Sequence, residues 1–189
     1  MRHKYQTSAL VLSRSPLGEA NASVMLLTPD LGLVRARAQG VRQSGAKLAT
    51  ALVTFAESDV VLVHGKEGWR IAGAVLAENW FSRLRHTQSQ TRAARVCQLL
   101  LRLVAGETQD RELFPVVLDF FYALATLPED VHESAEVLAA LRLLAALGLD
   151  AGDIPSIGPA FAPESLATIS KNRATYIARI NRGITASGL

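Results

Sequence analysis

The stretch that decides the fold of the N-terminal region is Leu33-Val34-Arg35-Ala36-Arg37-Ala38-Gln39. Apolar residues alternate in it with long polar ones, and a period of two is typical of a β-strand with one buried face and one solvated face. We therefore expect Val34, Ala36 and Ala38 to face a core. The two arginines between them are expected to face outward.

Four more strand-like segments lie on either side of this one, at residues 9–12, 23–28, 58–64 and 69–76. Each is short and mostly apolar, and Gly- or Pro-containing turns separate most of them. Five short strands in about 80 residues are typical of a small β-barrel, and the OB-fold is the common five-stranded case. The pattern alone also allows an SH3-like barrel.

The periodicity changes to that of a helix after Asn79. Apolar positions recur at helical spacing over residues 81–104, 112–127, 133–147 and 164–182. A loop rich in proline and glycine is expected at 148–163, and a fraying tail from residue 183. We predict an α+β two-domain protein, with an N-terminal OB-fold β-barrel at residues 1–80 and an all-α helical domain at residues 81–189.

Composition and motifs exclude several classes of protein. The 189 residues, 49% of them hydrophobic, are enough to bury a core without covalent staples. A single cysteine, Cys97, excludes both an internal disulfide and a cysteine-based zinc site within one chain. The four histidines are scattered, and no phosphate-loop, dinucleotide-binding, metalloprotease or serine-hydrolase motif is present. We therefore expect no catalytic residue, no metal and no cofactor.

The chain also lacks the signals of a membrane or exported protein. No run of about 18 apolar residues exists that could cross a bilayer. The N-terminus has no apolar signal core. We expect a protein that does not associate with membranes and works in the cytoplasm.

Positive charge is concentrated in two regions of a chain whose net charge is only +3. Residues 1–47 hold seven basic and two acidic residues, and residues 81–110 hold five basic and two acidic residues. Basic regions of this kind indicate surfaces that bind nucleic acid, although solvated faces of an ordinary soluble protein give the same pattern.

The arginines of residues 33–39 are the best-supported candidates for phosphate binding. Alternate residues of a strand lie about 6.6 Å apart, which is close to the phosphate spacing of an extended single strand. A guanidinium can bind a phosphate through paired donors, and the strand 2–3 face of an OB-fold is its usual oligonucleotide surface. The predicted nucleic-acid-binding residues of the barrel are Arg35, Arg37, Arg42, Lys47 and Arg14.

A second candidate for phosphate binding is a stripe on the predicted helix 81–104, formed by Arg85, Arg92 and Arg95. Aromatic residues are few in the barrel region, and Phe55 and Trp69 are expected to be core residues rather than stacking platforms. Binding should then depend on the phosphate backbone and tolerate many sequences.

The residues leave two alternatives open. The chain could be a single-stranded nucleic-acid-binding or RNA-binding OB-fold module with a regulatory helical domain. It could also be a protein-interaction adaptor whose basic faces meet an acidic partner.

The run from Gly18 to Arg42 (GEANASVMLLTPDLGLVRARAQGVR) resembles the N-terminal signature of the bacterial RecO family of DNA repair proteins. That signature has a Gly-Glu turn, a strand ending in Thr, an acidic-Gly turn and a strand leading into a Gly-x-Arg loop. Residues 52–63 are also similar to the corresponding part of the family. Arg35, Arg37 and Arg42 are the basic residues that the resemblance carries over.

The resemblance implies a non-catalytic recombination mediator with an OB-fold followed by a helical domain. Such a protein binds single- and double-stranded DNA, anneals complementary strands, and helps to load the recombinase RecA onto strands coated by the single-strand-binding protein SSB. The implied partners are RecR and the acidic C-terminal tail of SSB, and the implied location is the cytoplasm, in association with the nucleoid. Many relatives hold a four-cysteine zinc site, but residues 148–163 contain no cysteine, so no zinc is expected.

Overall fold

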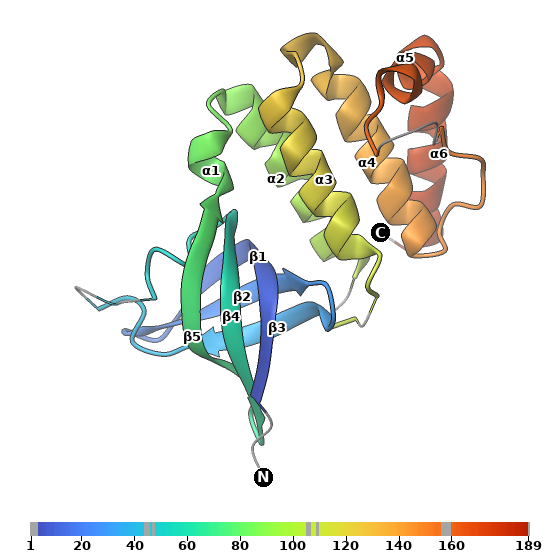
Figure 1. The fold of residues 1–189 in the computed structure, drawn as a ribbon. Coiled ribbons are helices and arrows are strands. Elements are labelled where there is room, and N and C mark those ends of the chain that lie inside the picture. The colour runs from blue at the N-terminus through green and yellow to red at the C-terminus, as the bar shows by residue number, and fades with distance from the viewer. Residues whose placement is uncertain are drawn as a thin grey trace. The chain divides into compact units, whose positions relative to one another are not determined.

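The computed structural model describes residues 4–43, 46, 48–104, 107–108, 110–155 and 160–188. The chain divides into two compact units. Residues 1–83 and 106–114 form the first unit, and residues 84–105 and 115–189 form the second. The first unit contains all five strands and the short helix α1, and the second consists of helices, so the predicted α+β fold class is confirmed (Figure 1). The division into domains at residue 80 stays a prediction.

Five strands build the first unit: β1 (Lys4–Leu17), β2 (Asn21–Thr28), β3 (Gly32–Ala38), β4 (Ala56–Gly65) and β5 (Gly68–Asn79). They form a closed barrel in the order β1-β2-β3-β5-β4. The pairing of β3 with β5 is parallel and the other four pairings are antiparallel. A five-stranded barrel with this strand order is an OB-fold, as the sequence predicted.

β1 is much longer than the apolar segment 9–12 from which it was predicted. Its first half, from Lys4 to Leu10, pairs with β4, and its second half, from Leu10 to Leu17, pairs with β2. The two pairings meet at Leu10, and a register shift between Val11 and Ser13 follows within the pairing with β2. The polar ends belong to the strand because both neighbours satisfy their backbone groups, which apolar patterning does not reveal.

The barrel core is formed by small and branched apolar side chains from all five strands. The predicted inward face of β3 is confirmed, since Val34, Ala36 and Ala38 are all buried. Trp80 is fully buried too, and its indole Nε1 donates a hydrogen bond to Glu57 Oε2 at 2.9 Å.

A separate segment of chain completes the edge of β3. Leu33 and Thr108 form an antiparallel bridge, with backbone N–O distances of 2.9 and 3.2 Å. The bridge lies at the start of β3, while β5 pairs with its last three residues, so both parts of this edge are occupied. Gly32 makes the close approach possible, because a Cβ there would lie 2.0 Å from the Thr108 carbonyl oxygen.

The helices are α1 (Trp80–Arg83), α2 (Thr87–Leu103), α3 (Leu113–Thr126), α4 (His132–Ala146), α5 (Pro163–Lys171) and α6 (Arg173–Ala186), with the short 3-10 turn η1 (Glu129–Val131) before α4. α4 is the centre of the second unit: it packs against α2, α5 and α6, and most of its residues are buried (Figure 1). Within the described part of the chain, none of the helices has the length and apolar character that a membrane span requires.

Two predicted helices are broken in the structure. The helix expected at 81–104 is interrupted after α1, where His86 is extended (φ −100°, ψ 132°). The break is stabilised because Leu84 is buried and its carbonyl accepts a hydrogen bond from Gln90 Nε2 at 2.9 Å. The helix expected at 164–182 is divided between α5 and α6 at Asn172.

The tail expected from residue 183 is also wrong, because α6 continues to Ala186. Gly183 is buried, and a Cβ at this position would lie 3.1 Å from Leu144 Cδ1. The glycine therefore marks close helix packing rather than a helix end.

Candidate nucleic-acid interface

Arg35 and Arg37 lie on the outer face of β3, as predicted, and both are exposed. Arg35 Nε lies 3.4 Å from Met25 Sδ on the neighbouring strand. Arg37 forms an ion pair with Glu67 at 3.2 Å, and the two side chains are 45% and 81% exposed. Exposed pairs of this kind contribute only about 0.2–1 kcal/mol, so Arg37 can exchange Glu67 for a phosphate at little cost.

The barrel closure brings a further arginine to this face. In the parallel pairing of β3 with β5, Arg37 is the register partner of Arg70. Like charges opposite one another are unfavourable in a sheet, and a bound anion would relieve their repulsion. Sequence reasoning missed Arg70 because its position depends on a parallel pairing between strands distant in sequence, for which a local pattern carries no signal.

Arg14 lies near the end of β1, and Arg42 lies in the segment that follows β3. Arg42 Nη1 donates to the carbonyl of Gly18 at 2.6 Å, and Arg14 Nη2 donates to the carbonyl of Val41 at 3.3 Å. Arg42 thereby connects the segment after β3 to the β1–β2 turn, and Arg14 connects that segment to β1. Each guanidinium has five N–H donors, so neither role uses all of them. The fifth candidate of the barrel, Lys47, lies outside the described residues.

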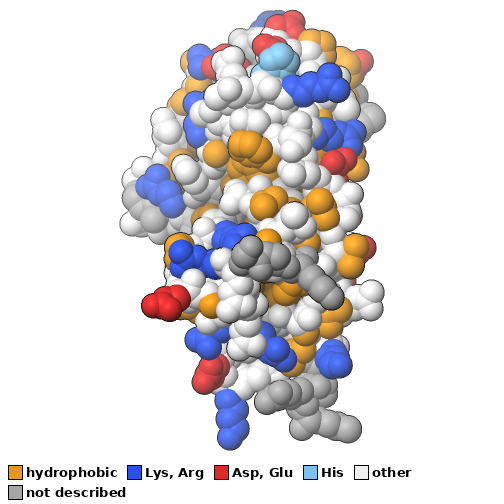
Figure 2. All heavy atoms as spheres, turned by 90° about the vertical axis from the view of Figure 1, so that its left-hand side faces the viewer, with side chains coloured by type: hydrophobic (Ala, Val, Ile, Leu, Met, Phe, Trp, Pro, Cys, Tyr) orange, Lys and Arg blue, Asp and Glu red, His pale blue; other side chains and the backbone are white. Residues whose placement is uncertain are grey.

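Figure 2 shows how charge is distributed on one face of the molecule. Lys and Arg side chains are spread over the lower part of this view, with only a few acidic side chains among them. Such a surface provides several separate contacts for phosphates rather than one deep anion site.

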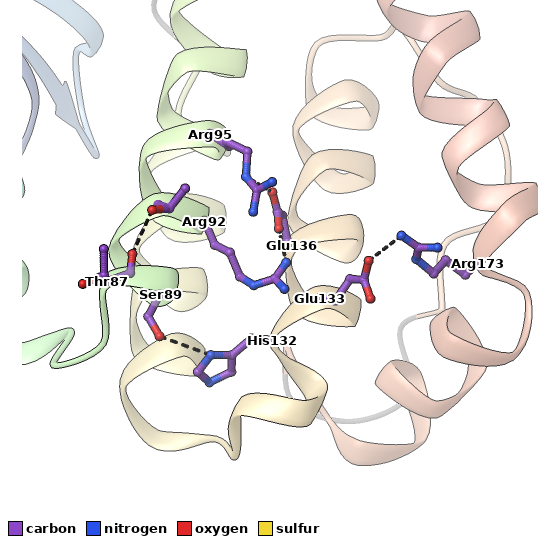
Figure 3. Close-up of polar contacts among 9 residues, drawn as sticks. Thr87, Ser89, Arg92, Arg95, His132, Glu133, Glu136 and Arg173 are labelled. Carbon is purple, nitrogen blue, oxygen red and sulfur yellow. Dashed lines mark hydrogen bonds and ion pairs between the residues drawn. The ribbon is translucent and has the colours of Figure 1, made fainter.

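The candidate residues of the helical unit are arranged differently from the prediction. Arg85 lies in the break between α1 and α2, so the expected stripe on a single helix is wrong. Arg92 and Arg95 do lie on α2, and both contact Glu136 of α4, at 2.5 and 2.9 Å (Figure 3). Only 13% of the Arg92 side chain is exposed, against 54% for Arg95.

A groove of about 290 Å³ lies beside these ion pairs, between α2, α4 and α6. Charged side chains line it on both sides, including Arg173, which pairs with Glu133 (Figure 3). Its apolar lining consists of Val96, Leu99, Val137, Ala140, Ile177 and Ile180. The groove could hold an apolar side chain from a segment that also carries charge.

The buried polar residues of the helical unit have structural partners. His132 Nδ1 lies 3.3 Å from Ser89 Oγ, and its Nε2 lies 2.9 Å from the Leu127 carbonyl (Figure 3). The carbonyl can only accept, so Nε2 donates to it. Burial raises the pKa of Cys97 to about 12, which disfavours a reactive thiolate. Among the described residues, no group of three or more His, Cys, Asp or Glu could hold a metal ion.

The fold and the face together define a class: an OB-fold barrel with an arginine-bearing β2–β3 surface, followed in the chain by a helical bundle. Residues 1–79 match the family model "Recombination protein O N terminal". This region of the chain is therefore similar to the N-terminal domain of the RecO family, and the resemblance inferred from residues 18–42 is confirmed.

Full-length relatives agree with the family match. The chain is 30% identical to the DNA repair protein RecO of Dehalococcoides mccartyi over 116 residues, which are 61% of this chain and 46% of that protein. It is 31% identical to the RecO of Clostridium novyi over 144 residues (76% and 56%). It is 30% identical to the RecO of Heliobacterium modesticaldum over 173 residues (85% and 62%). The chain thus spans about half the length of the relatives it matches.

Proposed function

We propose that this protein is a non-catalytic DNA repair and recombination mediator that binds single- and double-stranded DNA through the outer face of β2, β3 and β5. The observation that carries the proposal is the pair of exposed arginines at strand spacing on β3, Arg35 and Arg37, with the partly exposed Arg70 of β5 as the register partner of Arg37. Phosphate contacts fix the position of a strand without reading its sequence, so binding should be tolerant of sequence.

Salt dependence of binding to a labelled oligonucleotide tests the proposal. Each phosphate contact on a single strand contributes about −0.7 to the slope of log K against log salt. The double variant Arg35→Ala/Arg37→Ala should therefore lower the affinity for all sequences and reduce the slope by about 1.4. A folded double variant with unchanged affinity and slope would refute the assignment of this face and favour the acidic-partner adaptor.

The further activities of the proposed mediator are strand annealing and help in loading a recombinase onto SSB-coated strands, with RecR as a partner, in the cytoplasm at the nucleoid. Annealing of complementary labelled strands separates this function from an OB-fold module that only binds DNA or RNA. Duplex formation should be faster with the protein than without it. The Arg35→Ala/Arg37→Ala variant should lose this acceleration.

A second binding function is supported by the groove between α2, α4 and α6. We propose that it receives the acidic C-terminal tail of SSB, with an apolar side chain of the tail against Leu99 and Ile177 and its carboxylates on Arg95 and Arg173. Both arginines are about half exposed, so their exchange from Glu136 and Glu133 to a peptide carboxylate costs little. The variant Arg95→Glu/Arg173→Glu should abolish binding of a synthetic acidic tail peptide and leave DNA affinity unchanged, whereas unaltered peptide binding would refute this site.

A further inference from the structure

A groove at one end of the barrel is lined by aromatic as well as basic residues. It has a volume of about 960 Å³ and lies where the start of β1, the end of β3 and the β4–β5 hairpin meet. Tyr5, His64 and Trp69 are its aromatic residues, and Arg37 and Arg70 are among its basic ones. Arg37 thus belongs both to this groove and to the proposed DNA-binding face.

The three aromatic rings form one cluster centred on Trp69. Its ring centroid lies 5.3 Å from that of Tyr5 and 4.6 Å from that of His64, and both pairs are edge-to-face, with interplanar angles of 73° and 71°. The strand register explains the cluster, because Trp69 is the partner of His64 across β4 and β5, and Tyr5 is the partner of Leu62 across β1 and β4.

The cluster is accessible from solvent. Tyr5 is 41% exposed, His64 is exposed, and Trp69 is only partly buried, packing against the barrel core while also lining the groove. The expectation that Trp69 is a core residue is therefore only half right. Exposed apolar patches rimmed by polar residues often mark ligand-binding grooves.

The chemistry of the groove selects its ligand. Open aromatic rings stack on planar unsaturated rings, and adjacent guanidiniums bind phosphate oxygens. The register pair Arg37 and Arg70 supplies two guanidiniums at the edge of the same groove, and Lys66 of the hairpin turn adds a third positive charge. A planar ring joined to a phosphate is a nucleotide, and several kinds of base suit such a surface because every base has a π-face.

We infer that this groove holds an unstacked base of a single-stranded nucleic acid against the Tyr5–His64–Trp69 cluster, with the adjoining phosphates on Arg37 and Arg70. The inference rests on the proposed function and deepens it, since it assigns the DNA-binding face a preference for single strands. A duplex cannot use the cluster, because its bases are already stacked and paired.

Tyr5 is the residue to change, because its ring is exposed whereas Trp69 also packs against the core. Tyr5→Leu should lower the affinity for a short oligothymidylate by about 5- to 150-fold, since stacking on one aromatic side chain is worth this range per base. The salt slope should not change, because no phosphate contact is lost. Tyr5→Phe keeps the ring and should bind like the wild type.

Two further measurements separate stacking from a general loss of binding. Affinity for a duplex should be equal in the wild type, Tyr5→Leu and Tyr5→Phe. The wild type should bind an abasic strand more weakly than oligothymidylate. The affinity for the abasic strand should be the same in the wild type and in Tyr5→Leu. Tryptophan emission should be quenched by oligothymidylate and not by the abasic strand, because Trp69 is accessible and Trp80 is fully buried.

The outcomes distinguish this inference from the proposed function. If single strands bind but Tyr5→Leu matches the wild type on both oligothymidylate and the abasic strand, the stacking site is wrong and the DNA-binding face stands. If the folded wild type binds neither single strand nor duplex, both the face and the groove are wrong. Circular dichroism melting of each variant confirms that the folded protein is being compared.

Discussion

Arg37 of β3 and Arg70 of β5 are register partners in the parallel pairing that closes the barrel. Neighbouring strands lie about 4.8 Å apart, so two cationic side chains leave the sheet side by side. Glu67 compensates part of this charge through its exposed ion pair with Arg37. Like charges at paired positions of a sheet are unfavourable, so removing this pair should not destabilise the fold.

The first prediction concerns this pair. Arg37→Ala/Arg70→Ala should lower the affinity for single strands and reduce the salt slope by about 1.4, while the melting temperature stays unchanged or rises, because a like-charge contact is removed. Fluorescence anisotropy at several salt concentrations and thermal melting measure the two effects. Lys171→Ala/Arg182→Ala, which removes two exposed positive charges from α5 and α6, is the control of equal charge and should leave the slope unchanged. Equal losses in both variants would mean that only net charge matters.

The second prediction concerns Gly32, where β3 begins beside Thr108. Gly32→Ala should destabilise the fold by about 2–3 kcal/mol, because its φ of +65° disfavours a side chain and the new Cβ would collide with the Thr108 carbonyl. Gly18→Ala is a matched control: φ is +67°, but nothing lies within 4 Å of the added Cβ. Gly18→Ala should lower the free energy of unfolding by only about 1 kcal/mol, because the only penalty is that of a side chain in the left-handed conformation.

Urea unfolding of both glycine variants measures the difference. An equal loss in the two variants would show that the contact between residues 107–108 and the start of β3 does not constrain Gly32.

Local patterns of the sequence were sufficient to predict the barrel. The alternation in residues 33–39 predicted which side chains of β3 are buried, because a half-buried strand imposes a period of two on its residues. The five strands and the helical second part follow from the same kind of local signal. The extra length of β1 does not, because its polar ends are held by pairing with two different strands.

The candidate site was predicted only in part, for the same reason. Arg35 and Arg37 are marked by their own strand, whereas Arg70 and the cluster around Trp69 arise from register between strands that are distant in sequence. Helical periodicity predicted that Arg92 and Arg95 lie close together on α2. It could not predict their ion-pair partner Glu136, because this residue comes from α4. The breaks at His86 and Asn172 lack a proline or glycine that would have marked them.

The third prediction uses the pKa of Cys97. The folded protein holds the thiol protonated up to about pH 12, against an ordinary value of 9.0, so alkylation by a maleimide at pH 8 should be negligible until the chain unfolds. The raised pKa also means that only the unfolded state loses this proton above pH 9, so stability should fall between pH 9 and about 12. Cys97→Ala should flatten this part of the stability curve. Rapid alkylation of the folded protein would contradict the burial.

The last prediction separates folding from binding on α2. Arg92→Ala should destabilise the protein by about 1–2 kcal/mol, because the arginine and Glu136 are both mostly buried in their ion pair, although Arg95 still contacts the carboxylate afterwards. Arg95→Ala removes a more exposed arginine from the same carboxylate and should cost less than about 1 kcal/mol. Neither variant should change the affinity for single-stranded DNA, since the proposed face lies on the barrel strands. Thermal melting and anisotropy on the same samples give both quantities. If a variant melts like the wild type but loses DNA affinity, these arginines contact phosphates instead. A DNA phosphate would then replace Glu136 as their partner.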